Sequence, residues 1–173
     1  MHDRLAGSES LRGRVRRVER RMPDEEARRW LQAQKVVHVA TRDHEGWPDV
    51  IPLVFVSPSG KRLYFHTGAQ GGHFLSNVRA DPRVCVEAAV IGPLHPGKPY
   101  ACNSALVYTS VVAFGRLRIV DDEATKSWFF DRLMEKYSDL GLFEPGYPLL
   151  DRIVLYEMTI ELLTGKRSER LRP

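Results

Sequence analysis

The stretch from Arg62 to Val90 constrains the fold most, and it reads RLYFHTGAQGGHFLSNVRADPRVCVEAAV. It begins with an apolar and aromatic run typical of a half-buried strand. Three glycines then give a turn the backbone freedom it needs, and apolar residues at helical spacing follow from His73 to Arg79. Asp81-Pro82 ends this helix, because proline disfavours helical geometry in the residue before it. We therefore predict a strand, a glycine turn, a short helix and a second strand.

The glycine turn suggests a possible ligand. A turn that leads into a helix presents free backbone N–H groups and the positive end of the helix dipole, which together suit a phosphate. The same pattern also occurs as a tight connection that binds nothing. The residues of the turn by themselves leave both interpretations open.

The rest of the chain alternates with a period of two residues, as strands do. Further strands are predicted over Val36–Thr41, Pro48–Val56, Leu106–Val120 and Ile153–Leu163. Short turns join the early strands, which favours an antiparallel meander over parallel βαβ units. Helices are predicted from Pro23 and from Asp121 or Asp122 to about Tyr137, and Gly115 inside a long strand indicates a bulge or a close backbone approach. The predicted fold class is mainly β, with helices added.

Length and composition indicate one domain. The chain has 173 residues, 43% of them hydrophobic, and a net charge of +4, which is ordinary for a globular protein. We divide it into a basic N-terminal arm (1–22), a folded domain (23–166) and a charged C-terminal tail (167–173), with a Pro- and Gly-rich loop over Val90–Ser104. The basic excess lies mainly in the arm, so nucleic-acid binding is not expected. No membrane span or signal peptide is found, and we expect a cytoplasmic protein.

Several kinds of site are not indicated. No G-x-G-x-x-G follows a strand, and no P-loop lysine motif occurs, which argues against Rossmann and P-loop folds. No G-x-S-x-G motif suggests a catalytic serine. His38, His44, His66 and His73 lie on separate predicted elements, and we predict no metal site. A cofactor that carries its own redox chemistry fits a chain without an evident acid–base pair.

Three motifs occur in a characteristic order: LYFHTG with GGHFLSNVRADPRVCVE, then YTSVVAFGRLRIVDD, and finally ELLTGK. Together they resemble the FMN-binding split-barrel superfamily, and within it the pyridoxamine 5′-phosphate oxidase-related proteins of the nitroimidazole-resistance type. The resemblance covers roughly residues 25–166. It implies an antiparallel six-stranded split β-barrel with flanking helices, and FMN bound at the interface of a homodimer.

The resemblance also implies a set of cofactor-binding residues: Ile51, Pro52, Leu53, Val54, His66, Thr67, Gly72, His73, Phe74, Asn77 and Ser110. The first four belong to the strand whose backbone follows the edge of the flavin ring, and the residues from 72 to 77 hold the phosphate. His66 is also the predicted catalytic residue. Many relatives have Lys or Arg where this chain has Gly72-His73-Phe74, so phosphate binding here would depend on backbone N–H groups and His73, with Arg79 as a further candidate. Without a ligand, His66 and Ser110 would be ordinary hydrogen-bonded strand residues.

Three functions follow as hypotheses from the resemblance. The first is an FMN-dependent oxidoreductase that reduces a small molecule, for example a nitroaromatic compound, with electrons from NAD(P)H or a partner. The second is oxidation of pyridoxamine 5′-phosphate, which the C-terminal sequence LLTGKRSERLRP disfavours because it lacks the Arg- and Trp-rich pattern of that enzyme. The third is a flavin- or haem-binding protein without turnover, for which His95 is a potential haem ligand. A deazaflavin is an alternative cofactor on the same fold.

Overall fold

The segment from β4 to β5 folds in the predicted order. β4 (Arg62–Gly68) leads through the glycine turn into α2 (His73–Ala80), and β5 (Arg83–His95) follows Asp81-Pro82. Phe74, Leu75 and Val78 of α2 are buried, as their helical spacing predicted. The computed structural model describes residues 12–168 of the chain.

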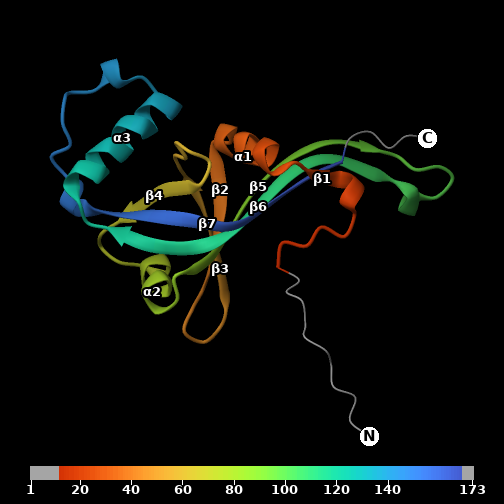
Figure 1. Ribbon diagram of the computed structural model, residues 1–173, viewed down its shortest axis with the longest axis horizontal. Coiled ribbons are helices and arrows are strands. Elements are labelled where there is room, and N and C mark those ends of the chain that lie inside the picture. The colour runs from red at the N-terminus through yellow and green to blue at the C-terminus, as the bar shows by residue number, and fades with distance from the viewer. Residues whose placement is uncertain (1–11, 169–173) are drawn as a thin grey trace, which may run out of the picture.

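The other strands are β1 (Arg21–Met22), β2 (Val36–Arg42), β3 (Pro48–Val54), β6 (Ala105–Val120) and β7 (Ile153–Ser168). They form one antiparallel sheet in the order β1-β7-β6-β5-β2-β3, and β4 pairs with another part of β7 (Figure 1). The six strands β2–β7 make the predicted split barrel, and β1 adds a short seventh strand. Within the described residues, β3 and β4 contact each other without a ladder, and just beyond the end of β3 a single antiparallel bridge joins Val56 to Tyr64 of β4. We call the facing edges of these two strands the seam.

Two apolar clusters hold the fold together. The first fills the barrel with inward-facing residues that alternate along the strands, such as Val37 and Val39 on β2. Helix α1 (Asp24–Ala33) adds Ala27 and Leu31 to this cluster. The second cluster lies between β4, β7 and α3 (Glu123–Tyr137). Figure 1 shows α3 and the projecting end of the β5–β6 hairpin at opposite ends of the molecule.

Of the two caps predicted for α3, the structure has the second. Asp122 is the N-cap residue, and its side chain accepts a hydrogen bond from the backbone N–H of Thr125 at 2.8 Å. Such a bond satisfies one of the N–H groups that a helix start leaves without a partner.

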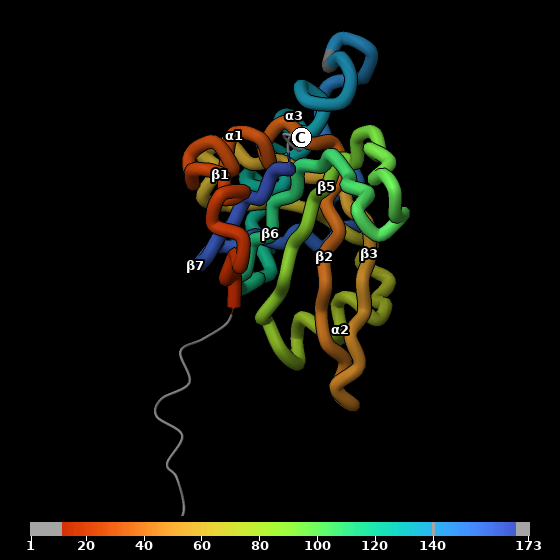
Figure 2. The backbone as a smooth tube through the Cα atoms, turned by 90° about the vertical axis from the view of Figure 1, so that its right-hand side faces the viewer, coloured from red at the N-terminus to blue at the C-terminus, as the bar shows by residue number. Residues whose placement is uncertain are grey.

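Two strands are longer than predicted. β5 continues to His95, inside the predicted loop, because β6 offers it partners as far as Ala105. A register shift between Ile91 and Leu94 accommodates Pro93, which has no N–H for the ladder. This extension forms the hairpin that projects in Figure 1 and that Figure 2 shows from its tip. The predicted loop is therefore much shorter, with the short helix η2 (Ala101–Asn103) near its end.

β7 likewise extends to Ser168 instead of ending at Leu163, since β6 pairs with it along this length. Arg167 and Ser168 of the predicted tail thus belong to β7, and residues 169–173 lie outside the described residues. Of the predicted basic arm, residues 1–11 also lie outside them, while Val18–Arg20 form the short helix η1 and the next two residues form β1.

The bulge predicted at Gly115 is confirmed. The pairing of β6 with β7 shifts register between Phe114 and Gly115. A Cβ atom at Gly115 would collide with the carbonyl oxygen of Thr159 on β7. A residue without a side chain is therefore required where β6 bends over β7.

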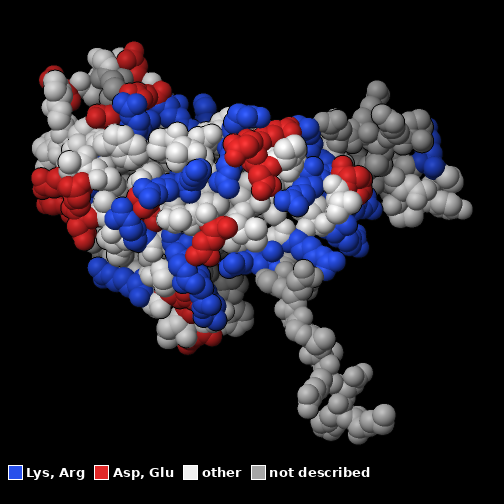
Figure 3. Space-filling model, viewed as in Figure 1, with Lys and Arg blue, Asp and Glu red and all other residues white. Residues whose placement is uncertain are grey.

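The surface carries charges of both signs. Figure 3 shows Lys and Arg interspersed with Asp and Glu over the visible face. Among the described residues, no helix is both long and apolar enough to cross a bilayer.

Candidate functional site

The glycine turn opens the first turn of α2 toward solvent. Gly71 and Gly72 have φ angles of 91° and 143°, which residues with a side chain rarely adopt. No heavy atom lies within 4 Å of the position that a Cβ would take at either glycine. The first helical hydrogen bond runs from the N–H of Ser76 to the carbonyl of Gly72, so the N–H groups of the preceding three residues have no helical acceptor. This arrangement suits an anion.

The side chains around this turn divide into exposed and buried groups. Gly72 and His73 are exposed at the helix start, where a ligand can reach them. Phe74 is buried, and its ring packs edge-on against that of Tyr156 with the centroids 5.1 Å apart. Asn77 is also buried and donates a hydrogen bond from Nδ2 to Oγ1 of Thr41 at 3.0 Å. Phe74 and Asn77 therefore hold α2 against the barrel.

Thr67 lies at the end of β4 and reaches toward the same side as α2. Its hydroxyl is 3.0 Å from the hydroxyl of Tyr156 on β7. Tyr156 is fully buried, and burial raises the pKa of its phenol, although the hydrogen bond with Thr67 and the charge of Arg79 act in the opposite direction. Tyr156 thus remains a neutral hydroxyl at neutral pH and fixes the position of the Thr67 side chain.

His66 lies on the other side of β4. Its ring contacts the rings of Phe129 and Phe130 on α3, with centroids 5.4 Å and 5.3 Å away. In residues 12–168, its Nδ1 is the one buried side-chain nitrogen or oxygen that has no hydrogen-bond partner. Burial lowers the pKa of the imidazole, so the ring is neutral at neutral pH. His66 is therefore a half-buried neutral imidazole between β4 and α3, and it does not lie beside the Thr67 side chain.

The predicted residues on β3 also face two ways. Ile51 and Leu53 pack against the barrel core, whereas Pro52 and Val54 are exposed. β3 has a hydrogen-bonded neighbour, β2, on one side, and its other edge belongs to the seam. A backbone edge without a partner is able to accept and donate hydrogen bonds to a planar ligand.

The exposed residues of β3 continue into one face of the sheet. A row of directly opposed residues crosses five strands in the order Pro52, His38, Glu87, Val112, Thr164. Opposed residues in an antiparallel sheet point to the same side, and we call this side the outer face. Val50 and Val54 flank Pro52 on the outer face and are exposed, so the face is apolar along β3.

Ser110 lies on the outer face too, but far from β3. It is opposed by Ala89 on β5 and by Lys166 on β7. Two strands separate β6 from β3, which corresponds to about 14 Å at the usual strand spacing. One chain therefore brings Thr67 and the start of α2 together around Tyr156, whereas Ser110 lies two strands away from β3.

The sequence prediction missed a basic group next to Ser110. Nζ of Lys166 lies 5.4 Å from the centroid of the Tyr108 ring. Burial raises the pKa of Tyr108, but the side chains of Lys166 and Arg20 outweigh it and lower the pKa overall. Lys166 was assigned to the domain end and Arg20 to the arm. Strand pairing places Lys166 beside Ser110, and both Lys166 and Arg20 act on Tyr108.

A comparison with protein families matches residues 23–167 to the pyridoxamine 5′-phosphate oxidase family. By sequence, no curated protein matches the chain.

Solved structures share the fold. One is a candidate 5-nitroimidazole antibiotic resistance protein from Bacteroides thetaiotaomicron, with 21% identity, a TM-score of 0.70, and coverage of 84% of this chain and 85% of that one. The flavocytochrome Anf3 from Azotobacter vinelandii has 20% identity, a TM-score of 0.82, and coverage of 95% and 78%. The FAD and haem binding protein from Mycobacterium smegmatis has 18% identity, a TM-score of 0.74, and coverage of 86% and 73%.

Proposed function

Because the chain belongs to the pyridoxamine 5′-phosphate oxidase family, we propose that it binds FMN between two copies of itself and acts as an oxidoreductase on a small molecule. The observation that carries this proposal is the open start of α2 directly after β4. Free N–H groups, two glycines with positive φ and an exposed histidine meet there.

The phosphate of FMN would bind at the start of α2. The N–H groups of residues 73–75 and the side chain of His73 are the donors, and the helix dipole favours the negative charge. The chain has no Lys between Lys61 and Lys98, so backbone groups supply most of the binding. The hydroxyl of Thr67, fixed by Tyr156, lies at the strand end that leads into this turn.

The flavin ring would lie along the seam. The unpaired edge of β3 offers backbone groups to the polar edge of the ring, and the exposed Pro52 and Val54 offer apolar contact. When bound, a flavin supplies electron or hydride transfer to the substrate. The protein's own part is to bind the ring, to orient it and to exclude water from it.

A second copy of the chain would complete the site. The outer face is apolar along β3, and exposed apolar faces of this kind mark interfaces. Closed two-fold dimers are the commonest assembly of identical chains, and in such a dimer the outer faces of two copies pack together. Ser110 and Lys166 of one copy would then approach the seam of the other. The second copy would thereby supply residues that lie too far from the seam within one chain.

Haem binding by His66 is the second candidate function. Two of the proteins that share the fold are described as a flavocytochrome and as an FAD and haem binding protein. A neutral imidazole is the form of histidine that ligates iron, and phenylalanine rings form an apolar wall beside it. His95, the ligand considered from sequence, lies instead at the end of the β5 extension. His66 therefore joins His95 as a candidate haem ligand.

The absorption spectrum of the purified protein, followed by titration of the ligand-free protein with FMN, FAD and haem, separates these functions. We expect the visible bands of oxidised flavin and tight binding of FMN. A Soret band that disappears in His66→Ala but persists in His95→Ala would support the haem function. A protein that binds none of the three ligands would contradict both proposals.

A further inference from the structure

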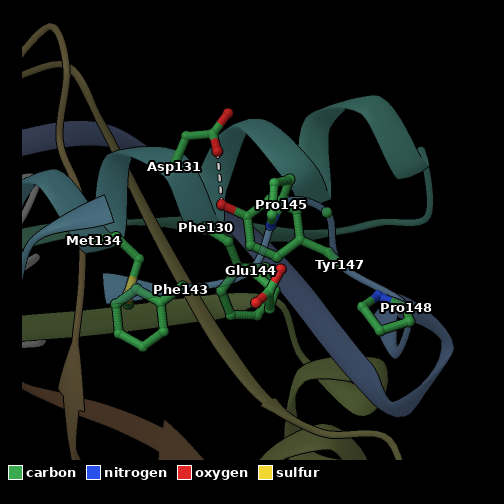
Figure 4. A pocket seen from close by; sticks show the side chains of 9 residues that line it. Phe130, Asp131, Met134, Phe143, Glu144, Pro145, Tyr147 and Pro148 are labelled. Carbon is green, nitrogen blue, oxygen red and sulfur yellow. Dashed lines mark hydrogen bonds between the residues drawn. The ribbon is translucent and has the colours of Figure 1, made fainter. Parts of the chain in front are cut away.

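The segment that joins α3 to β7 forms a pocket that the proposed flavin site does not use. The pocket has a volume of about 600 Å³ and lies between α3 and residues 143–148, within the range of small-molecule sites. Figure 4 shows the hydrogen-bonded pair Tyr147–Asp131 on one side and Met134 with Phe143 on the other.

Specific contacts hold the walls in place. The Tyr147 hydroxyl donates a hydrogen bond to Oδ1 of Asp131 at 2.6 Å. The rings of Tyr147 and Phe130 stack with centroids 5.4 Å apart. Gly146 has a φ of 93° and turns the chain back toward α3. At the end of the segment, the buried Lys126 donates to the carbonyl of Ile153 at 3.3 Å. These contacts show that the walls of the pocket are held in place by the fold.

The charges of the lining are all negative. Asp131 and Glu144 contribute carboxylates, and no Lys or Arg lines the pocket. Within residues 12–168, no hydrogen bond or ion pair occupies Glu144. Such a lining repels a phosphate or a haem propionate, so neither cofactor proposed above fits here. It attracts a cation, and the faces of Phe130, Phe143 and Tyr147 add cation–π attraction.

We propose that this pocket binds a small organic cation, such as an alkylated or aromatic ammonium. The cationic nitrogen lies beside Asp131 and Glu144, and the apolar part lies against Phe130, Phe143 and Met134. The Phe130 ring contacts the pocket residue Tyr147 and also His66. A ligand in the pocket is thus separated from His66 by one aromatic ring. The proposal does not depend on a bound flavin or haem.

Three probes of similar size test the charge preference on the full-length chain by isothermal titration calorimetry. They are benzyltrimethylammonium, which is cationic, benzyl alcohol, which is neutral, and phenylacetate, which is anionic. We expect the cation to bind about tenfold more tightly than the alcohol, and we expect no binding of phenylacetate. Added salt should weaken binding of the cation only.

Variants then locate the site. Glu144→Gln and Asp131→Asn preserve shape and should each weaken binding of the cation several-fold while leaving the alcohol unchanged. Phe143→Ala should weaken both. Glu123→Gln, on the first turn of α3 and outside the pocket, is the control and should change neither. Thermal unfolding of each variant shows that it is folded. Equal affinity for the three probes, or cation binding unchanged in the Asp131→Asn/Glu144→Gln double variant, would overturn the proposal.

Discussion

His66 and Thr67 are neighbours in β4, yet their side chains lie on opposite sides of the strand. The Thr67 hydroxyl bonds to Tyr156 on the α2 side of the strand, and the His66 ring packs against Phe129 and Phe130 of α3. The two residues were predicted as a pair next to one cofactor. The structure gives them separate surroundings, so the two substitutions should have separable effects.

His73→Ala should weaken FMN binding with little change in stability, because His73 is exposed at the start of α2. Loss of a hydrogen bond to a charged phosphate corresponds to about 1.5–3 kcal/mol, or roughly ten- to a hundredfold in affinity. Fluorescence titration with FMN measures this change. His44→Ala, on the exposed turn between β2 and β3, is the control. Unchanged FMN affinity in His73→Ala would place the phosphate elsewhere.

Gly72→Ala should destabilise the protein through the backbone alone. The φ of 143° is unfavourable for alanine, and no atom lies near enough to clash with a Cβ. We expect the free energy of unfolding to fall by about 1–2 kcal/mol in urea denaturation. Gly68→Ala also has open space around it, but its φ is ordinary. If the two variants lost equal stability, the backbone of Gly72 would not be the cause.

His66 should make stability depend on pH. Its folded pKa lies below the ordinary value of 6.5 because burial disfavours the charged ring, so the unfolded chain binds the proton more readily. The stabilisation is therefore present above the unfolded pKa and decreases as the pH falls below about 6.5, down to the folded pKa. His66→Leu should reduce this slope, as measured by urea denaturation at several pH values. An unchanged slope would mean that His66 is hydrated and titrates normally.

Glu157 should also make stability depend on pH, but in the acid range. As for His66, its contribution to stability should be lost as the pH falls. Its carboxylate accepts bonds from Arg118 at 2.9 Å and from the Tyr64 hydroxyl at 2.7 Å. Arg118 most strongly lowers its pKa. The stabilisation is present above the unfolded pKa near 4.5 and is lost as the pH falls through the lower folded pKa.

Glu157→Gln should therefore lower the unfolding free energy at neutral pH by about 1–3 kcal/mol. Glu161→Gln is the matched control on the same strand, since Glu161 pairs with Arg116 at the surface, where such a pair contributes about 0–1 kcal/mol. Equal losses in the two variants would show that burial of Glu157 has no energetic effect.

Val50→Lys should convert the proposed dimer to a monomer, because it places a charge on the outer face where two copies would pack. Sedimentation velocity at micromolar concentration measures the change. Leu142→Lys changes another exposed apolar residue, beyond α3, and should leave the dimer intact. A wild-type protein that sediments as a monomer with flavin bound would contradict the proposed two-chain site.

Local sequence determined most of the elements. Apolar patterns located β2 to β6 along the chain, an aspartate located the start of α3, and Asp81-Pro82 located the end of α2, because these signals act over a few residues. The same alternation implies that His66 and Thr67 face opposite ways. The bulge at Gly115 was likewise predictable, since a glycine inside a strand indicates close backbone approach.

Tertiary structure decided which residues surround each face of β4. Whether His66 faces the barrel or α3 depends on the packing of a helix more than fifty residues away in the sequence. The lengths of β5 and β7 depended on the partner strand β6. The proximity of Ser110 to Lys166 depended on the register between β6 and β7. The pocket lined by Asp131, Glu144 and Tyr147 forms because residues 143–148 fold back against α3. These features arise from contacts between distant segments, and the spacing of residues within one segment carries no information about them.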